Sequence, residues 1–209
     1  MTEFNRNIMK KISIFVLLIV SLSTVSAQKN DFSSWSFTAE YGLSSLDGDG
    51  DSYIKQTFGA GAEYEFLPFA GVSVGYYHFP LAGAAFSTAL NTAEVNLTLN
   101  INRLIFGRKD DKVILKGYLG FGLASYTTTY TASALANFTS YRLASSFPVV
   151  ALSVEFPVVE TFSLGLKSQF RPFNKNNLEG DPRYNLDNMT IDYLVALTLF
   201  LRVKLYAAN

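Results

Sequence analysis

Apolar and polar residues alternate along residues 92–104. In this stretch Ala93, Val95 and Leu97 alternate with Glu94 and Asn96. Because successive side chains on a strand point to opposite faces, the pattern predicts one apolar face and one polar face. A helix of the same sequence would scatter both kinds of residue around its circumference. The pattern therefore predicts a β-strand that separates two different environments.

The same alternation recurs along most of the chain and predicts eight strands. Their expected ranges are 33–44, 56–67, 70–79, 92–104, 112–126, 147–156, 162–171 and 191–205. Long and short connections alternate, and the longer ones are expected at 45–55, 80–91, 126–145 and 172–188. In an antiparallel meander the four long connections then lie at one end and three short turns at the other. The chain is thus predicted to be all-β, an eight-stranded antiparallel up-and-down barrel.

The content of the two faces indicates which of them meets water. Alternation alone also fits a soluble lipocalin-like barrel, which holds its apolar face inside. Here the polar faces are rich in Gly, Ser, Thr and Ala with few charges, which suits the narrow interior of an eight-stranded barrel. The apolar faces carry no charge, as lipid contact requires, since a charge at the bilayer midplane costs about 2–4 kcal/mol. We therefore expect a transmembrane β-barrel with its ionic groups inside.

Composition narrows the function classes. Charged residues make up 16% of the chain and aromatic residues 15%, whereas about a quarter of a soluble domain is usually charged. The chain contains no Cys, which excludes disulfides and thiolate metal sites. Its formal net charge is zero, and no basic face indicates nucleic-acid binding. We expect no cofactor and no resident metal.

The N-terminus has the pattern of a cleavable signal peptide. Its basic segment contains Arg6, Lys10 and Lys11. An apolar core at 12–22 follows, and small residues ending at Ala27 match the positions that signal peptidase reads. The core is short for a membrane span of roughly 20 residues. We expect cleavage before Gln28, which gives a signal peptide at 1–27 and a barrel domain at 28–209.

Ionisable residues on the polar faces are predicted to form a charge network in the barrel lumen. The set comprises Glu40, Glu63, Glu65, Glu94, Lys116, Glu155, Lys167, Arg171, Asp192 and Arg202. Buried charges require partners or water. We expect Arg171 to pair with Asp192 beside the last long connection, and Arg202 to reach Glu40 or Glu63 because the first and last strands close the barrel. The network is interpreted as structural, and a gated ion path is the alternative.

Two further groups of residues have candidate chemistry. Asp47, Asp49 and Asp51 resemble a calcium-binding loop but lack a carboxylate at the twelfth position, so a solvated outer connection with at most weak Ca²⁺ binding is predicted. His78 is the only histidine, and with Ser87 or Glu94 it is the one candidate set for a lipid-modifying enzyme. Their spacing matches no nucleophile motif, so a non-enzymatic protein is expected.

On this strand pattern, residues 28–209 resemble the small eight-stranded outer-membrane barrels, the OmpA-barrel and OmpX-like group of the porin family type. The resemblance implies an integral protein of the Gram-negative outer membrane that contacts outer-membrane lipids and lipopolysaccharide. It also implies insertion by the barrel-assembly machinery. The expected role is structural, or binding and adhesion through the long connections. The alternatives are a small porin for small or hydrophobic solutes, a lipid-modifying enzyme, and a soluble lipocalin-like binder.

Overall fold

The structure, a computed structural model, describes residues 34–47, 52–83, 86–107, 112–130, 139–173 and 192–206. The predicted signal peptide at 1–27 lies outside the described residues. The elements are β1 (Ser34–Asp47), β2 (Ser52–Tyr53), β3 (Lys55–Leu67), β4 (Ala70–Gly83), β5 (Phe86–Asn100), α2 (Ile101–Phe106), β6 (Ile114–Tyr130), β7 (Thr139–Val159), β8 (Phe162–Phe173) and β9 (Asp192–Tyr206).

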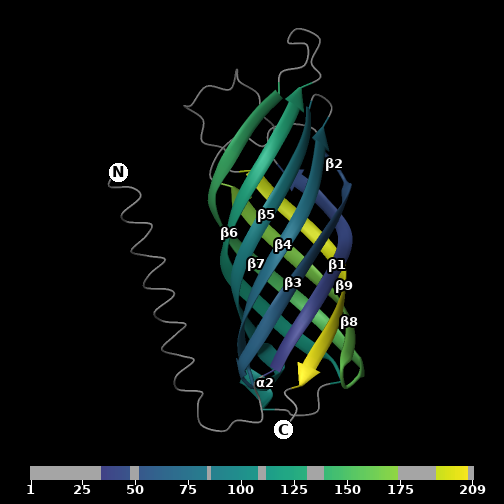
Figure 1. Cartoon of the computed structure of the whole chain (residues 1–209). Coiled ribbons are helices and arrows are strands. Elements are labelled where there is room, and N and C mark those ends of the chain that lie inside the picture. Colours follow the sequence, from purple (N-terminus) through teal and green to yellow (C-terminus); the bar gives the residue numbers. More distant parts are fainter. Residues whose placement is uncertain are drawn as a thin grey trace, which may run out of the picture.

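The long strands form one closed antiparallel barrel. Each pairs with its neighbours in the chain, β1 also pairs with β9, and the β4–β5 pairing completes the ring. The two-residue β2 pairs with the far end of β4. Figure 1 shows the strands inclined to the barrel axis, as closure of a sheet requires. The predicted all-β, eight-stranded antiparallel barrel is confirmed for the described part of the chain.

Several strands are longer than predicted, which corrects the expected connections. The connection expected at 80–91 is wrong, because β4 and β5 stay paired from Pro80↔Ala89 to Ala82↔Ser87. Pro80 is tolerated because β4 has one paired side at this position: its pairing with β3 ends at His78, and its pairing with β2 begins at Ala82. On that unpaired side of β4 a proline removes no backbone hydrogen bond. Likewise β1 extends into 45–55, β6 and β7 extend into 126–145, and β8 extends to Phe173.

The two ends of the barrel differ. At one end, here the turn end, lie the turn at Pro68 and Phe69, the turn at Glu160 and Thr161, and α2. The opposite end, here the loop end, carries the connections at 48–51, 84–85, 131–138 and 174–191, which lie outside the described residues. In Figure 1 the strands of β6 and β7 rise furthest at the loop end.

The strand predicted to continue to Leu104 is wrong in its last residues. The strand ends at Asn100, whose side-chain oxygen accepts a hydrogen bond from the Arg103 backbone N–H at 3.1 Å and so caps α2. Gly107 ends the helix with φ 61°, a left-handed conformation that glycine adopts at little cost. No helix in the described ranges is long and apolar enough to span a membrane.

Apolar side chains cover the outside of the barrel. Leu199 is 64% exposed and Leu97 37% exposed, whereas the inward-facing Glu94 and Lys167 are 3% and 5% exposed. This arrangement is the reverse of a soluble lipocalin-like barrel. We call the outward-facing apolar set the apolar belt. Its members are Phe37, Leu43, Val74, Val95, Leu97, Leu119, Phe121, Leu123, Val150, Leu152, Leu164, Leu166, Val195, Leu197, Leu199, Leu201 and Val203.

Candidate functional site in the barrel lumen

The lumen nearest the turn end holds a balanced set of charges, the turn-side ionic cluster. Its members are Glu63, Glu65, Glu155, Lys116, Arg202 and Lys204. Lys116 Nζ lies 2.9 Å from Glu63 Oε1 and 2.6 Å from Glu65 Oε1. Arg202 Nη1 lies 2.9 Å from Glu63 Oε2 and 3.4 Å from Glu155 Oε2. Each acidic residue therefore faces a cation, as burial of charge requires.

Neutral donors complete this cluster. Thr98 Oγ1 donates to Glu63 Oε1 at 2.9 Å, and Arg202 Nη2 donates to the Tyr118 hydroxyl at 3.0 Å. The Lys204 ammonium lies 3.7 Å from Glu155 Oε1, and its side chain is 14% exposed. The network thus links β3, β5, β6, β7 and β9 through side chains alone, and it fixes their relative positions across the lumen.

A second set of charges, the central ionic cluster, lies closer to the middle of the barrel and consists of Glu40, Glu94, Lys167 and Arg171. Lys167 Nζ lies 3.0 Å from Glu40 Oε1. Arg171 binds Glu94 with two contacts, Nε to Oε1 at 2.5 Å and Nη2 to Oε2 at 3.2 Å. Such bidentate pairs are among the stronger and more directional polar contacts in proteins.

Neutral polar groups satisfy the rest of the Glu40 carboxylate. Gln169 Nε2 and Thr198 Oγ1 each donate to Glu40 Oε2 at 2.9 Å. The Tyr77 hydroxyl donates to Glu40 Oε1 at 3.1 Å and accepts from Lys167 Nζ at 2.9 Å. The Tyr77 ring fits because the facing positions are glycines: a Cβ at Gly75 would come within 2.7 Å of the ring. Glycine on the inner faces therefore makes room for the aromatic side chains of the network.

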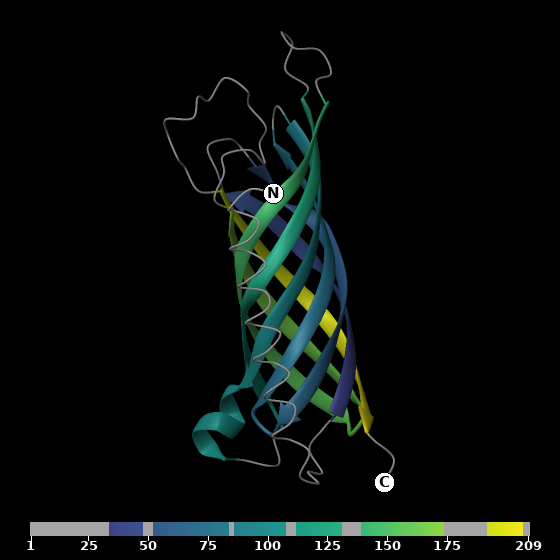
Figure 2. The ribbon, with the colours of Figure 1, turned by 60° about the vertical axis from the view of Figure 1, so that its left-hand side comes forward.

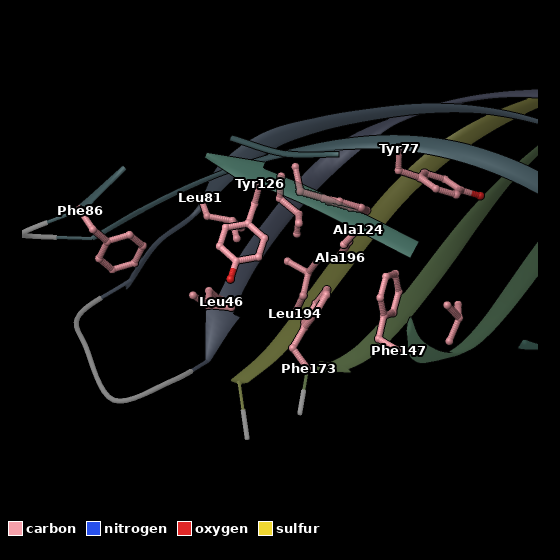
Figure 3. Packing of buried hydrophobic residues seen from close by; sticks show 13 residues of the cluster. Leu46, Tyr77, Leu81, Phe86, Ala124, Tyr126, Phe147, Phe173, Leu194 and Ala196 are labelled. Carbon is pink, nitrogen blue, oxygen red and sulfur yellow. The ribbon is translucent and has the colours of Figure 1, made fainter. Parts of the chain in front are cut away.

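Apolar side chains gather in the loop-end half of the lumen, beside buried Thr88, Thr128 and Asp192, and we call this apolar set the apolar plug. It consists of Leu46, Tyr77, Phe79, Leu81, Phe86, Leu90, Ala124, Tyr126, Phe147, Val149, Phe173, Leu194 and Ala196. Figure 3 shows these side chains directed from several strands into the same interior space. The Arg171 guanidinium lies 4.5 Å from the Phe79 ring centroid, where the plug meets the central ionic cluster. The alternation pattern of the sequence does not by itself predict this plug.

Little empty space remains between the two ionic clusters. A cavity of about 10 Å³ lies there, about the volume of a single water site. Its charged and phenolic lining residues are Glu40, Glu63, Lys167, Arg202, Tyr77 and Tyr118. A cavity of this size leaves no room for a solute.

All ten residues of the predicted charge network are on inward-facing positions, although not every predicted pair forms. Arg202 contacts Glu63, one of its two expected partners. The expected pair between Arg171 and Asp192 is wrong: Arg171 instead binds Glu94, because the register places it opposite Leu194 and its guanidinium crosses the lumen. Lys204, Tyr77 and Gln169 belong to the network and were not predicted. Each of them lies two residues after a residue that faces the lumen: Lys204 after Arg202, Tyr77 after Gly75 and Gln169 after Lys167. This spacing is the sequence signal that places all three on the inner face.

The structure describes only part of the candidate calcium site and does not bring the candidate enzyme residues together. Asp47 ends β1 and is exposed, whereas Asp49 and Asp51 lie outside the described residues. The set of His78 with Ser87 or Glu94 does not assemble. His78 faces outward and its Nδ1 lies 2.8 Å from Asn91 Oδ1, whereas Glu94 faces the lumen and binds Arg171. No group of three or more metal-binding side chains occurs within the described residues.

Aromatic side chains lie on the outside near both limits of the apolar belt. Towards the turn end, the rings of Trp35 and Tyr64 lie 4.9 Å apart. Towards the loop end, Phe170 stacks on Tyr193 at 5.3 Å. Tyr and Trp with one apolar and one polar side are typical of membrane–water interfaces. The belt and its aromatic limits therefore match the profile of a lipid bilayer.

Comparison with known structures finds barrels of this kind. Neisserial surface protein A is 15% identical with a TM-score of 0.58, covering 82% of this chain and 97% of that protein. Ail, the attachment invasion locus protein of Yersinia pestis, is 12% identical with a TM-score of 0.51, covering 83% and 99%. Ail in complex with the heparin analogue sucrose octasulfate gives 13% identity and the same TM-score, with the same coverage. The chain has the fold of the small eight-stranded outer-membrane β-barrels.

No family model matches the chain, and no curated protein matches it. The likeness therefore concerns the fold. The lumen of this barrel holds two neutral ionic clusters, towards the turn end and in the middle, and an apolar plug at the loop end.

Proposed function

We propose that the chain is an integral outer-membrane protein that does not conduct, and that its barrel is a rigid anchor for the connections at the loop end. Outer-membrane barrels have short periplasmic turns and longer outside connections. On that rule the turn end faces the periplasm, and the connections at 48–51, 84–85, 131–138 and 174–191 face outward. Binding or adhesion is then the role of these connections.

The observation that carries the proposal is the filled lumen. Most inward side chains of the described barrel are nearly inaccessible to water: Arg202 is 2% exposed, Arg171 0% and Leu194 0%. Glu65 and Lys204, near the turn end, are 18% and 14% exposed at their side chains. A water-filled pore would leave its lining side chains solvated, as in larger barrels. This supports the anchor over the small porin.

Conductance in planar lipid bilayers separates the two roles. We expect purified, folded protein to insert without producing stable unitary current steps, because ions would have to displace both the ionic clusters and the apolar plug. The same preparation should show the heat-dependent gel mobility of a folded barrel, which serves as the control for folding. Reproducible steps of uniform size would instead establish a porin.

The binding role is tested by altering the connections without touching the barrel. In one variant, residues 131–138 and 174–191 are replaced by short Gly-Ser linkers. In a second variant, residues 174–191 are shuffled at constant composition, which tests whether their order matters. Cells displaying each protein are tested for adhesion to immobilised heparin and gelatin. Heparin is included because Ail, of the same fold, was solved with a heparin analogue.

We expect the native chain to adhere to at least one surface, and both variants to lose adhesion while they keep folded gel mobility. If the native chain adheres to neither surface, or if the linker variant adheres equally well, the binding role is contradicted.

The same proposal includes export through cleavage before Gln28, contact with lipopolysaccharide, and insertion by the barrel-assembly machinery. An N-terminal sequence of the mature protein that includes residues 1–27 would contradict the export route.

A further inference from the structure

The helix α2 displays apolar side chains outside the barrel at the turn end. Leu104 is 52% exposed, Ile105 63% and Phe106 66%, and no residue of the helix is buried. Figure 2 shows α2 standing off the barrel wall. Three consecutive exposed apolar residues are unfavourable in water unless another phase covers them.

Polar contacts hold α2 in this position. Asn102 accepts from the Leu115 backbone N–H at 2.9 Å and donates to the Val113 carbonyl at 2.9 Å. Arg103 Nη1 donates to the Pro68 carbonyl oxygen of the neighbouring turn at 3.1 Å. A six-residue helix is too short to be stable alone, so these contacts and its two caps fix the direction in which its apolar side chains point.

The apolar residues of α2 continue the apolar belt towards the turn end. Outward-facing Leu97 and Leu99 precede the helix on β5, and Val113, which is 41% exposed, leads into β6 after it. Two described basic residues adjoin the helix along the chain, Arg103 within α2 and Lys112 just before β6. An apolar surface with adjoining basic residues is the combination found in helices that lie in the headgroup layer of a membrane.

We propose that α2 is an interfacial anchor that lies in the periplasmic leaflet of the outer membrane, with Leu104 and Ile105 among the upper acyl chains of phospholipids. The inference rests on the proposed insertion of the barrel in that membrane. It adds a contact with the headgroup layer, beyond the wall of the barrel, that fixes how deeply the turn end sits.

The chain contains no cysteine, so single cysteines report on chosen positions. Ile105→Cys is labelled with an environment-sensitive fluorophore in full-length mature protein that has been folded into phosphatidylethanolamine–phosphatidylglycerol vesicles. Leu199→Cys in the apolar belt and Glu160→Cys in the turn between β7 and β8 are the matched controls. Quenching is measured with phospholipids brominated near the headgroup or deep in the chain, and with aqueous iodide.

We expect the label at 105 to emit at shorter wavelength than the label at 160, and to be quenched at least threefold more by the shallow bromolipid than by iodide. The label at 199 is expected to respond best to the deep bromolipid. Leu104→Cys repeats the measurement in case the first variant folds poorly. If bromolipids quench the label at 199 while the labels at 104 and 105 are quenched like the one at 160, the anchor is refuted. If iodide and not bromolipid quenches the label at 199, the membrane insertion itself is refuted.

Discussion

Replacing Arg202 by methionine is expected to destabilise the folded barrel by about 3–5 kcal/mol, because it removes one partner from a buried ionic network. Arg202 contacts Glu63 at 2.9 Å, Glu155 at 3.4 Å and the Tyr118 hydroxyl at 3.0 Å. Without it, the turn-side ionic cluster keeps three carboxylates and two ammonium groups, and the two carboxylates that contact Arg202 are 3% and 0% exposed. Urea unfolding in phospholipid vesicles, monitored by gel mobility, measures the change.

The control for this prediction is Lys204→Met. Within the described part of the chain, the Lys204 ammonium forms one ion pair, with the same Glu155 at 3.7 Å, and its side chain is 14% exposed. Its loss is expected to cost below about 1 kcal/mol, as for partly solvated pairs. The double variant Arg202→Met, Glu155→Gln restores the charge balance and should recover part of the loss. If the double variant is no more stable than Arg202→Met, charge balance does not explain the effect.

A second large effect is expected from a charge in the apolar belt. Leu199 lies near the middle of β9, faces outward and is 64% exposed. Leu199→Arg should destabilise the barrel in vesicles by about 2–4 kcal/mol, since a cation near the bilayer midplane loses its hydration. Unfolding in urea from the same vesicles measures the loss.

Ser87→Arg is the matched control, because Ser87 also faces outward but lies near the loop end of β5. There the side chain reaches headgroups or water, and the expected cost is about 0–1 kcal/mol. Equal losses of stability from the two substitutions would mean that the surroundings of Leu199 are no more apolar than those of Ser87. That result would contradict contact between the apolar belt and lipid.

Alternation of residue types was sufficient to predict the barrel and the orientation of its faces. The inner face of β9 has Ala196, Thr198, Phe200 and Arg202. The outer face has Leu197, Leu199 and Leu201, so the alternation places the charged residue inside and the leucines outside. Parity does not give the stagger between neighbouring strands. This stagger determines which side chains come into contact across the lumen. That is why Arg202 was matched to Glu63 only as one of two options, and Arg171 was matched to the wrong carboxylate.

Two features of the sequence hide the apolar plug. Leu46, Leu81 and Leu90 fall in ranges that the pattern predicts as connections, whereas Phe147 and Leu194 fall in predicted strands but as apolar residues on the inner face. Phe79 and Leu81 have the inward parity of Gly75, and Leu90 has that of Glu94. Pro80 was interpreted as the end of a strand, although proline is compatible with a strand wherever one ladder is absent. Following the parity of β4 and β5 past Pro80 would have revealed an inner face that changes from small and polar to apolar.

The first four residues of α2, at 101–104, fall within the predicted strand for a similar reason. Ile101 and Asn102 continue the alternation of β5, so the pattern shows no break there. The signals for a helix are Asn100 as its N-cap and Gly107 as its C-terminal residue in the left-handed conformation. These local signals were weaker than the periodicity of the preceding residues.

The most direct test of the whole account is a spin-label scan along β9 in vesicles. Single cysteines replace residues 194 to 204 one at a time, and collisions of each label with dissolved oxygen are compared with collisions with a water-soluble nickel chelate. We expect a period of two, with high oxygen contact at 195, 197, 199, 201 and 203 and low contact with both reagents at the even positions. High nickel contact at the odd positions, or a profile without alternation, would contradict an apolar belt in lipid around a lumen filled with charge.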